Sequence, residues 1–492
     1  MNEKITGARW HMALALSVVA TFAIRSLYFG DPVVDADEQF YLLTGDRLLH
    51  GALPYVDIWD RKPVGLFLLY AGIRLLGGDG ILAYQLVAAG FVAATAIVIA
   101  TIARRIAGAG PAIVAAIAYP LAIGWSGGMG GQSPVLYNLP MAAAALLIVG
   151  LLEDRPRSGS LAARGTMAML LVGTAMQIKY SALYEGIYFG LALLWIGWRG
   201  RIGIPRLAAC AGLWIAVALV PTLLAFAAYA AMGHAQAFVF ANFTSILLRH
   251  NESAAYQALA LAKMLARLSP FLVALLAGEI LRRRQSASPT PVVRRFVLGW
   301  AGAALIGILL FGNYFNHYAL PWMVPLAIAA APAFALRPRA LGIAFAAVVL
   351  AANGIAYGLT WQRILHRSGD RAYAERIAGT IRAHLGAGCL YVFNGEPILY
   401  HLTGSCLPTR WPFPYHLSFR REATALGIDP LAEVRAIMAR RPSVVVDTID
   451  PTDPDVNRAA QAIVRADLAR HYRPVAAFRL RRDIRMVYAR LR

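Results

Sequence analysis

Long apolar runs are the feature that most limits what this chain can fold into. The sequence is 59% hydrophobic and only 15% charged, whereas soluble domains are about one quarter charged. Runs of about 20 apolar residues are long enough to cross the hydrocarbon core of a bilayer as helices. We predict eleven spans, at residues 10–29, 81–103, 110–126, 134–152, 163–179, 182–198, 206–231, 268–281, 294–311, 318–335 and 339–359.

The first apolar run is predicted to stay in the protein as a span. It is too long for the core of a signal peptide, and no small-residue cleavage site follows it. The net charge of +21 would suggest nucleic acid in a soluble protein. Here the Arg residues lie mostly in short loops or in the tail, and no RNA- or DNA-binding motif accompanies them. We therefore expect membrane lipids as surroundings and no nucleic acid as a partner.

The loop charges predict which ends of the spans share a side of the membrane. Lys and Arg mark alternate short loops, where the positive-inside rule works best. The apolar stretch 64–76 would reverse every later loop if it were a span, and it is short and contains Arg74. We interpret it as a helix at the outer interface or a re-entrant segment. This interpretation puts the N-terminus in the cytoplasm and the C-terminal tail outside. The marking residues are Lys4, Arg9, Arg104, Arg105, Arg155, Arg157, Arg164, Arg199, Arg201, Arg206, Arg282, Arg283, Arg284, Arg294, Arg295, Arg337 and Arg339.

The tail differs in composition from the rest of the chain. It contains stretches typical of strands, at 389–393, 443–447 and 485–489, and amphipathic stretches typical of helices, at 370–385 and 455–472. We predict an all-α polytopic membrane domain with about eleven transmembrane helices over residues 1–360, followed by a small α/β soluble domain over 361–492. The predicted outer loops of the membrane domain are 30–80, 126–134 and 232–267. Cys389 and Cys406 both lie in the tail; a disulfide in an oxidising compartment and two buried thiols both stay open.

The first outer loop is unusually acidic. A group of carboxylates directly after a span costs desolvation unless the carboxylates are paired or used. Capping of a helix that starts at Asp37 and Glu38 is the structural alternative, because the helix dipole favours acids in a first turn. Seven of the 26 acidic residues lie within residues 30–63: Asp31, Asp35, Asp37, Glu38, Asp46, Asp57 and Asp60.

This loop resembles the first outer loop of GT-C-type membrane glycosyltransferases, including the protein O-mannosyltransferase-like group and the lipid A aminoarabinose transferase. The matching features are Asp37-Glu38 just after the first span, Tyr41 three residues on, "GALPYVD" at 51–57 and Lys62-Pro63. The resemblance implies sugar transfer from a polyprenyl-phosphate carrier at the outer membrane face. Asp37, paired with Glu38, would act as the catalytic carboxylate, a general base on the acceptor hydroxyl or a group that positions it.

The same resemblance implies where the donor and the sugar would bind. Lys62 is the expected ligand of the donor phosphate, since a Lys beside carboxylates can hold a phosphate as a point charge. A snorkelling Lys is the structural alternative. Tyr41, Tyr55 and Asp57 of the loop are expected to bind substrate.

The next outer loop departs from the family pattern. Many relatives place a second acid there, but residues 124–140 contain none. Gln132, Tyr137 and Asn138 are the polar candidates for binding a sugar, although none of them can act as a base. The missing acid favours an enzyme without a metal site. We predict no required cofactor and no metal ligands; a divalent ion is compatible with this prediction but not favoured.

Three further outer positions each have a substrate-binding and a purely structural interpretation. Lys179 breaks the positive-inside pattern, which counts mildly for phosphate binding, and a snorkelling Lys is still the favoured alternative. Arg249, with His250, lies on a segment that is an amphipathic lid over the phosphate or a plain interfacial helix. His317 and Tyr318 open a late span, as substrate ligands or as members of an interfacial aromatic belt.

The sequence thus predicts a glycosyltransferase of the bacterial inner membrane that moves a monosaccharide from a polyprenyl-phosphate donor to an envelope glycolipid, polysaccharide or protein. A secondary transporter would show charges at mid-depth and broken helices in two halves, and few such charges and no repeat are seen. A non-catalytic envelope assembly protein with a degenerate site is the other alternative, which the missing second acid supports.

Overall fold

The computed structural model describes residues 7–154, 158–249, 252–282, 291–365, 369–449, 451, 453–480 and 482–491. Two compact units divide the chain. The first unit contains residues 1–28, 86–225 and 253–361, and the second contains 29–85, 226–252 and 362–492. Both units are assembled from three separate segments. Several residues used above lie outside the described ranges: Lys4, Arg155, Arg157, His250, Arg283 and Arg284.

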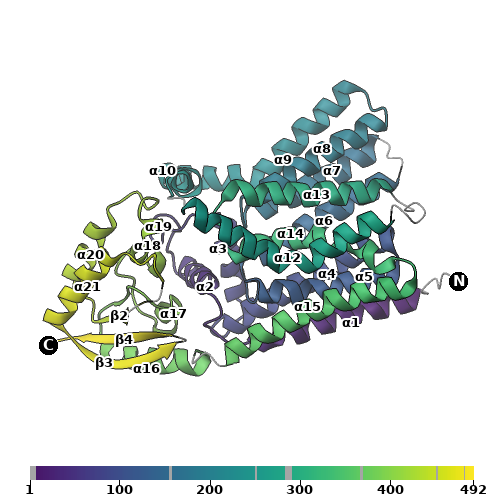
Figure 1. The fold of residues 1–492 in the computed structure, drawn as a ribbon. Helices are drawn as coiled ribbons and strands as arrows, with labels where there is room; N and C mark the ends of the chain where they lie inside the picture. Colours follow the sequence, from purple (N-terminus) through teal and green to yellow (C-terminus); the bar gives the residue numbers. More distant parts are fainter. Residues whose placement is uncertain are drawn as a thin grey trace. The chain divides into compact units, whose positions relative to one another are not determined.

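Long helices that run side by side make up the first unit (Figure 1). Close neighbours include α1 with α5, α6 with α7, α7 with α8, and α13 with both α8 and α14. Helices α4, α9 and α15 each continue for a few residues into the second unit. The helices are α1 (Gly7–Arg25), α4 (Ile81–Ala107), α5 (Ala109–Trp125), α6 (Ser133–Glu153), α7 (Ser158–Met176), α8 (Ala182–Arg199), α9 (Ile204–Ala231), α12 (Ala254–Arg282), α13 (Pro291–Phe311), α14 (Leu320–Ala330) and α15 (Arg339–Leu365). Single helical turns occur at Ser26–Tyr28 (η1), Asn316–Ala319 (η3) and Ala331–Ala335 (η4).

The prediction of eleven spans is too high by the criteria of length and composition. Every predicted span falls on a helix, but within the described residues only eight helices are long and apolar enough to cross a membrane. The other three are α5, with 17 residues, α7, which contains Arg164, and α8, which contains Glu185 and Arg199. A short length, in α5, or a lower mean hydropathy, in α7 and α8, therefore separates these three helices from the rest.

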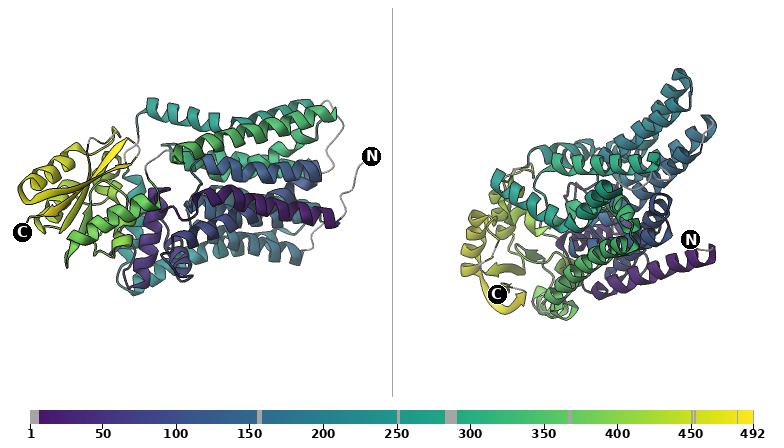
Figure 2. Two further views of the ribbon diagram at one scale, coloured as in Figure 1. Left: turned by 90° about the horizontal axis from the view of Figure 1, so that it is seen from below. Right: turned by 45° about the vertical axis from the view of Figure 1, so that its right-hand side comes forward.

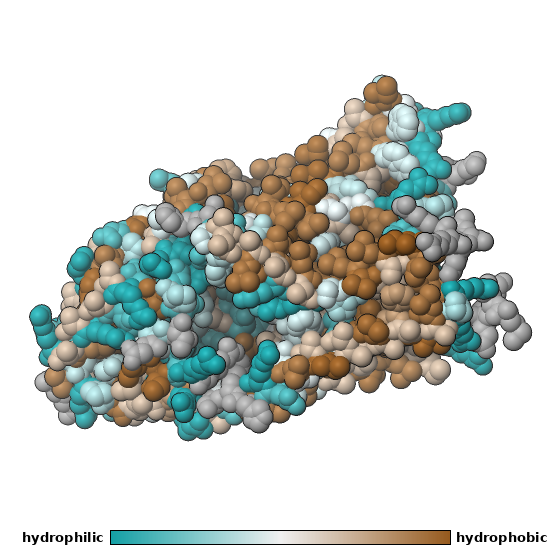
Figure 3. Space-filling view, viewed as in Figure 1, coloured by the Kyte–Doolittle hydropathy of each residue, from teal (hydrophilic) through white to brown (hydrophobic). Residues whose placement is uncertain are grey.

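Apolar side chains cover much of the outer surface of the first unit. Only 11% of the apolar window of α9 and 22% of that of α12 are buried. Exposed leucines such as Leu213, Leu223 and Leu276 cover these helices. The corresponding surface is brown in Figure 3. An apolar surface of this extent is costly in water and is satisfied by lipid.

The tail forms a four-stranded mixed sheet in the order β1-β2-β4-β3. Strands β1 (Leu390–Val392) and β2 (Val444–Ile449) are parallel, whereas β4 (Asp483–Arg490) runs antiparallel to both β2 and β3 (Tyr472–Leu480). The sequence predicted β1, β2 and β4. It missed β3, in which exposed and half-buried residues follow one another without a regular apolar face.

Helices cover both faces of the sheet, as Figure 2 shows in two views. Tyr391 and Val445 contact a core shared with α20 and α21, whereas Val392 and Val446 contact a core shared with α16. Alternate residues of each strand point to opposite faces, which explains this division. The helices of this α/β fold are α16 (Arg371–Leu385), α17 (Ile398–Thr403), α18 (Pro414–Ser418), α19 (Arg420–Ala423), α20 (Pro430–Ala439) and α21 (Arg458–His471).

Helix α2 (Ala36–Leu49), which carries the predicted acids, packs between two partners in the second unit. Phe40 and Leu43 enter the core shared with α16 and the sheet. On another side, Gly45 lies so close to α3 (Val64–Arg74) that an added Cβ would be 2.7 Å from the backbone nitrogen of Ala71. Helix α3 has 11 residues, or roughly 16 Å of length, and is therefore too short to span a bilayer core.

Two further features complete the second unit. Residues 235–247 form α10 (Ala235–Val239), a π-helical turn η2 (Phe240–Thr244) and α11 (Ser245–Leu247). Cys389 and Cys406 are joined as a disulfide, with their Cα atoms 5.0 Å apart. Of the two alternatives for these cysteines, the structure has the bonded one.

Candidate active site

The acidic helix α2 begins at a capped N-terminus. Asp35 has extended backbone, and its side chain accepts a hydrogen bond from the backbone N–H of Asp37 at 3.0 Å. Asp37 and Glu38 follow in the first turn, where the helix dipole favours negative charge. Asp37 is half-buried, whereas Glu38 has no exposed surface. Of the two predicted catalytic carboxylates, Asp37 is thus the one that a substrate can reach.

Charged side chains gather around the ring of Tyr41, one turn after Asp37. The ammonium group of Lys62 lies 5.4 Å from the centroid of this ring. Burial raises the pKa of Tyr41, and the charges of Asp37 and Asp60 raise it further. Burial also raises the pKa of Asp60, against the opposing charges of Lys62 and Arg61. These mutual effects place Asp37, Asp60 and Lys62 in one electrostatic cluster.

The connection between α2 and α3 fixes the backbone of Lys62. Tyr55 has a positive φ of 71° and is buried. Its hydroxyl donates to the carbonyl oxygen of Lys62 at 2.7 Å and lies 3.3 Å from Oδ1 of Asn242. Asp57 is exposed and accepts a hydrogen bond from the backbone N–H of Leu53 at 2.7 Å, which closes a turn. Both residues therefore have structural tasks in the loop, and their predicted contacts with substrate stay predictions.

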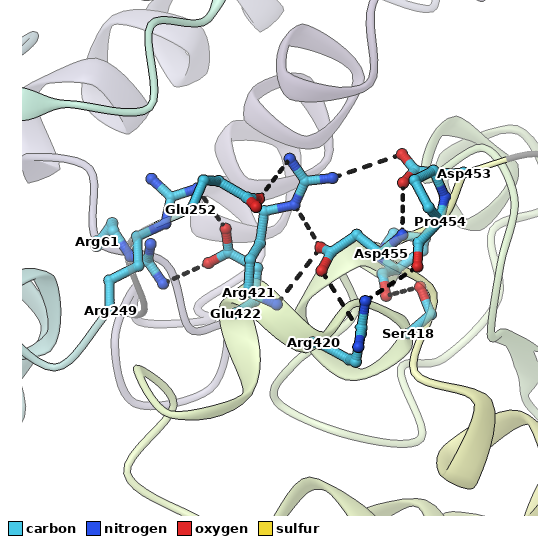
Figure 4. Close-up of polar contacts among 11 residues, drawn as sticks. Arg61, Arg249, Glu252, Ser418, Arg420, Arg421, Glu422, Asp453, Pro454 and Asp455 are labelled. Atoms are coloured by element: carbon cyan, nitrogen blue, oxygen red, sulfur yellow. Dashed lines mark hydrogen bonds and ion pairs between the residues drawn. The ribbon is translucent and has the colours of Figure 1, made fainter. Parts of the chain in front are cut away.

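Two arginines meet on one carboxylate of the tail, as Figure 4 shows. Glu422 contacts Arg61 at 2.7 Å through Oε2 and Arg249 at 2.8 Å through Oε1. Burial alone would raise the pKa of Glu422, but Arg61 and Arg249 outweigh it and hold the pKa at about 2. Two positive charges thus face one negative charge. The predicted phosphate ligand Arg249 lies in this cluster, and Arg61 joins it.

The residue before Glu422 anchors the same short helix, α19. Arg421 contacts Asp455 at 2.5 Å, Asp453 at 3.5 Å and Glu252 at 3.8 Å. The backbone N–H of Arg420 also donates to the carbonyl oxygen of Asp455 at 2.9 Å. These contacts hold the backbone of α19 on both sides and so fix the position of Glu422.

In the first unit, several predicted residues lie together at one end of the helices. The ammonium group of Lys179 lies 4.4 Å from the ring centroid of Tyr318, and the ring of His317 lies 4.9 Å from the same centroid. Gly127 has a φ of +89°, and an added Cβ would be 3.4 Å from the backbone nitrogen of His317. His317 is therefore held against the glycine-rich loop, residues 127–131, and the cation of Lys179 lies over the neighbouring ring of Tyr318. Cation–π contact of this kind stabilises Lys179 in place.

The glycine-rich loop is held by a residue that the sequence analysis did not select. Arg25, the last residue of α1, is 1% exposed and donates to the carbonyl oxygens of Gly128, Met129 and Gly130, each at 2.8 Å. Charge-assisted hydrogen bonds are stronger than neutral ones. The loop is therefore fixed by three of its carbonyl groups.

The polar residues at the start of α6 differ in their surroundings. Asn138 donates both amide hydrogens, to the hydroxyl of Tyr119 at 3.0 Å and to the carbonyl oxygen of Leu320 at 3.1 Å. Its amide thus joins helices, and a sugar could use only its oxygen. The hydroxyl of Tyr137 lies 3.3 Å from Oγ of Ser181, and Gln132 is buried. The contacts of these three residues with substrate stay predictions.

The predicted residues divide between the two units. The second unit holds Asp37, Glu38, Tyr41, Tyr55, Asp57, Lys62 and Arg249, and the first unit holds Gln132, Tyr137, Asn138, Lys179, His317 and Tyr318. Over the described ranges, no group of three or more His, Cys, Asp or Glu side chains is arranged to hold a metal ion.

Solved structures show which known fold this arrangement matches. ArnT from Cupriavidus metallidurans bound to undecaprenyl phosphate superposes with a TM-score of 0.64 at 15% identity, over 99% of this chain and 98% of that one. The Archaeoglobus fulgidus oligosaccharyltransferase, tethered to an acceptor peptide, superposes with a TM-score of 0.56 at 10% identity, over 99% and 74%. The chain has the GT-C glycosyltransferase fold.

Another GT-C protein extends the comparison. The mycobacterial arabinofuranosyltransferase AftD superposes with a TM-score of 0.52 at 16% identity, over 98% of this chain and 41% of that chain. No family model and no curated protein matches the sequence. The GT-C fold is therefore established by structure, and the predicted fold class, membrane helices followed by a small α/β domain, is confirmed.

Within this GT-C fold, sequence reasoning missed three residues near Asp37. Arg61 and Glu422 form the ion-pair cluster, and His416 of α18 is electrostatically coupled to both Asp37 and Lys62. Arg61 directly follows Asp60 in the sequence, and a surface ion pair of these two neighbours is the simpler interpretation of that pattern. Glu422 and His416 come from the tail, more than 350 positions from α2, and no local pattern in the sequence marks them.

Proposed function

We propose that the protein is a glycosyltransferase that moves a monosaccharide from a polyprenyl-phosphate carrier to an envelope glycolipid, polysaccharide or protein. The observation that carries the proposal is the position of Asp37. It is a half-buried carboxylate in a capped first turn, and it shares one electrostatic cluster with Lys62. The full-length GT-C fold supports the same reaction class, and the bound undecaprenyl phosphate of the ArnT structure supports the carrier.

In the proposed reaction, Asp37 removes the proton from an acceptor hydroxyl as its oxygen attacks C1 of the sugar. The bond between C1 and the phosphate oxygen breaks, and polyprenyl phosphate leaves with the electron pair. Lys62, supported by Arg61 and Arg249, stabilises the negative charge on the departing phosphate. A positioned base and fixed cations are the two requirements of such a transfer. Inverting stereochemistry is the expectation from the family resemblance.

The proposal also assigns a location. Residues 1–360 form the transmembrane catalytic part and 361–492 the extracytoplasmic part of a bacterial inner-membrane protein. The N-terminus is cytoplasmic, and the reaction takes place at the outer face. The predicted binding roles of Lys179, His317 and Tyr318 are part of the same proposal.

Replacement of Asp37 by Asn tests the proposal. The full chain is placed in nanodiscs with undecaprenyl phosphate carrying a labelled hexose or pentose, and an envelope extract serves as acceptor. The wild type is expected to release undecaprenyl phosphate, and Asp37→Asn to do so at least about 100-fold more slowly, because a general base contributes at least that factor. Glu375→Gln, which changes an exposed carboxylate of α16 outside the site, is the control and should retain most of the activity.

The outcomes distinguish the alternatives. Equal rates for Asp37→Asn and the wild type would refute Asp37 as the base. If the wild type releases no undecaprenyl phosphate from either the hexose-loaded or the pentose-loaded carrier, the non-catalytic assembly protein is favoured. Thermal unfolding serves as the control for folding. If the Asp37→Asn variant unfolds at the wild-type temperature, its lower rate is not caused by misfolding.

A further inference from the structure

His416 is a buried ring in an aromatic surround. It is 3% exposed, and it packs edge-to-face against Trp59, Phe413 and Phe40, with centroids 4.8, 5.1 and 6.2 Å away. Burial lowers the pKa of His416 to about 3, against the opposing charge of Glu422. The ring is therefore neutral at physiological pH. A neutral imidazole has one donor nitrogen and one acceptor nitrogen.

Polar atoms of two adjacent rings have no hydrogen-bond partner among the described residues. Nδ1 of His416 and Nε1 of Trp59 are both buried, and nothing in the described part of the chain bonds to either atom. A buried polar atom that makes no hydrogen bond costs about 1–3 kcal/mol in general. Two such atoms on touching rings are therefore typical of a place where a polar ligand group, rather than the protein itself, completes the bonding.

The position of these rings identifies the ligand group. The guanidinium of Arg61 lies 5.5 Å from the centroid of the Trp59 ring, and Arg61 belongs to the cationic cluster assigned above to the donor phosphate. His416 is also electrostatically coupled to Lys62 and Asp37. A group held here is thus next to the phosphate and next to the base. In a polyprenyl-phosphate donor, the phosphate joins an apolar prenyl chain to a sugar, and of these two only the sugar has groups that can hydrogen-bond to these ring nitrogens.

We propose that His416 and Trp59 form a subsite for an uncharged hydroxyl of the donor sugar, in which the two ring nitrogens bond to the hydroxyl. This inference rests on the proposed function. Trp59 N–H can only donate, so it donates to the hydroxyl oxygen, and Nδ1 of His416 accepts the hydroxyl proton. Because a hydroxyl meets both requirements and a carboxylate has no proton to offer, the subsite selects neutral sugars at this position.

The decisive variants separate hydrogen bonding from packing. His416→Phe keeps an aromatic ring and removes the polar atom, whereas His416→Gln keeps a hydrogen-bonding group. Phe413→Leu is the matched control, because it disturbs the same aromatic surround without changing a polar atom. The full-length variants are compared in nanodiscs. The probes are undecaprenyl phosphate alone and the same carrier loaded with glucose, galactose, mannose or arabinose.

The expected result is a loss confined to the sugar. His416→Phe should bind the best loaded carrier about three- to tenfold more weakly, which is the value of one ordinary hydrogen bond. Binding of undecaprenyl phosphate alone should change by less than about twofold. His416→Gln should recover part of the loss, and Phe413→Leu should show none. His416→Phe should unfold at the wild-type temperature or higher, because an apolar ring there removes one of the two buried nitrogens that lack a hydrogen bond among the described residues.

Three outcomes would overturn the subsite. One is equal weakening of loaded and unloaded carrier by His416→Phe, and another is a loss in Phe413→Leu as large as in His416→Phe. The third is a wild type that binds undecaprenyl phosphate but gains nothing from any sugar. In that last case the donor-phosphate site stands and only the subsite fails. A wild type that does not bind undecaprenyl phosphate refutes the proposed function and the subsite together.

Discussion

At the residue scale, single charged side chains join segments that are far apart in the sequence. Glu422 forms ion pairs with two arginines, and Arg25 donates hydrogen bonds to three carbonyl groups. Charges in such positions are expensive to leave uncompensated, because partial burial weakens their hydration. The polar contacts of the second unit are therefore expected to contribute to stability as well as to the site.

Replacement of Glu422 by Gln is expected to destabilise the protein by roughly 3 kcal/mol, because it removes the carboxylate that neutralises partly buried Arg61 and Arg249. The midpoint of thermal unfolding in detergent measures the effect. Glu375→Gln is the control, since its pairs with Arg371 and Arg382 are well exposed, and it should cost no more than about 0.5 kcal/mol. Equal effects of the two substitutions would contradict the assigned role of Glu422.

The pH dependence of stability should reveal the neutral state of His416. An unfolded histidine takes up a proton near pH 6.5, whereas folded His416, with its pKa lowered to about 3, stays neutral. Between these values the unfolded chain binds more protons, so stability falls as the pH falls from 6.5 toward 3. Thermal unfolding from pH 7 to pH 4.5 should show a shallower decline in His416→Phe than in the wild type. Identical slopes would mean that His416 is protonated in the folded protein.

At the element scale, two helices decide how Asp37 is presented. Helix α2 packs on α3 through Gly45, and on the sheet through Phe40 and Leu43. The sequence predicted α2 because its capping and periodicity are local properties. It also predicted that the stretch containing α3 is not a span but an interfacial or re-entrant segment. It did not predict that α2 would pack on the tail, because that contact joins residues far apart in the chain.

Replacement of Gly45 by Ala is expected to force α2 away from α3, because the new Cβ would lie 2.7 Å from a backbone nitrogen that cannot give way cheaply. We expect a loss of about 1–3 kcal/mol in stability, with a fall in transfer activity. Gly72→Ala on α3 is the matched control, since no atom lies within 4 Å of its added Cβ. That change should be neutral or stabilising by up to about 1 kcal/mol. A stable and active Gly45→Ala variant would show that the helices can separate without harm.

At the scale of the whole molecule, the spans and the fold class could be predicted because hydropathy is a property of contiguous residues. The number of full-length spans was too high, since α5, α7 and α8 are shorter or more polar than the others. The site was only half predictable. The acidic loop carries a recognisable spacing, whereas Glu422 and His416 reach α2 only through tertiary folding, and β3 lacks the alternation that identifies a strand.

The disulfide provides a test of where the tail is located. The Cys389–Cys406 bond closes a loop of 17 residues, and disulfides persist in oxidising compartments. In membranes from intact cells, a maleimide reagent should label Cys389 and Cys406 only after reduction. The double Ser variant should lose about 3 kcal/mol of stability. Labelling without reduction would place the tail in the cytoplasm. Cys210 is the free cysteine of the first unit and should be replaced by Ala beforehand.

The second unit is built from residues 29–85, 226–252 and 362–492, and this order has a consequence during synthesis. Helix α2 leaves the ribosome early, but α17 and the sheet strands on which it packs follow about 350 residues later. At a translation rate of about 5–20 residues per second, the partners of the acidic loop are synthesised roughly 20 to 70 s after the loop itself. Until then, Arg61 lacks its partner Glu422, and His416 is missing from the candidate site. A nascent chain therefore holds an incomplete site, and the proposed sugar transfer can begin only once translation has reached the tail.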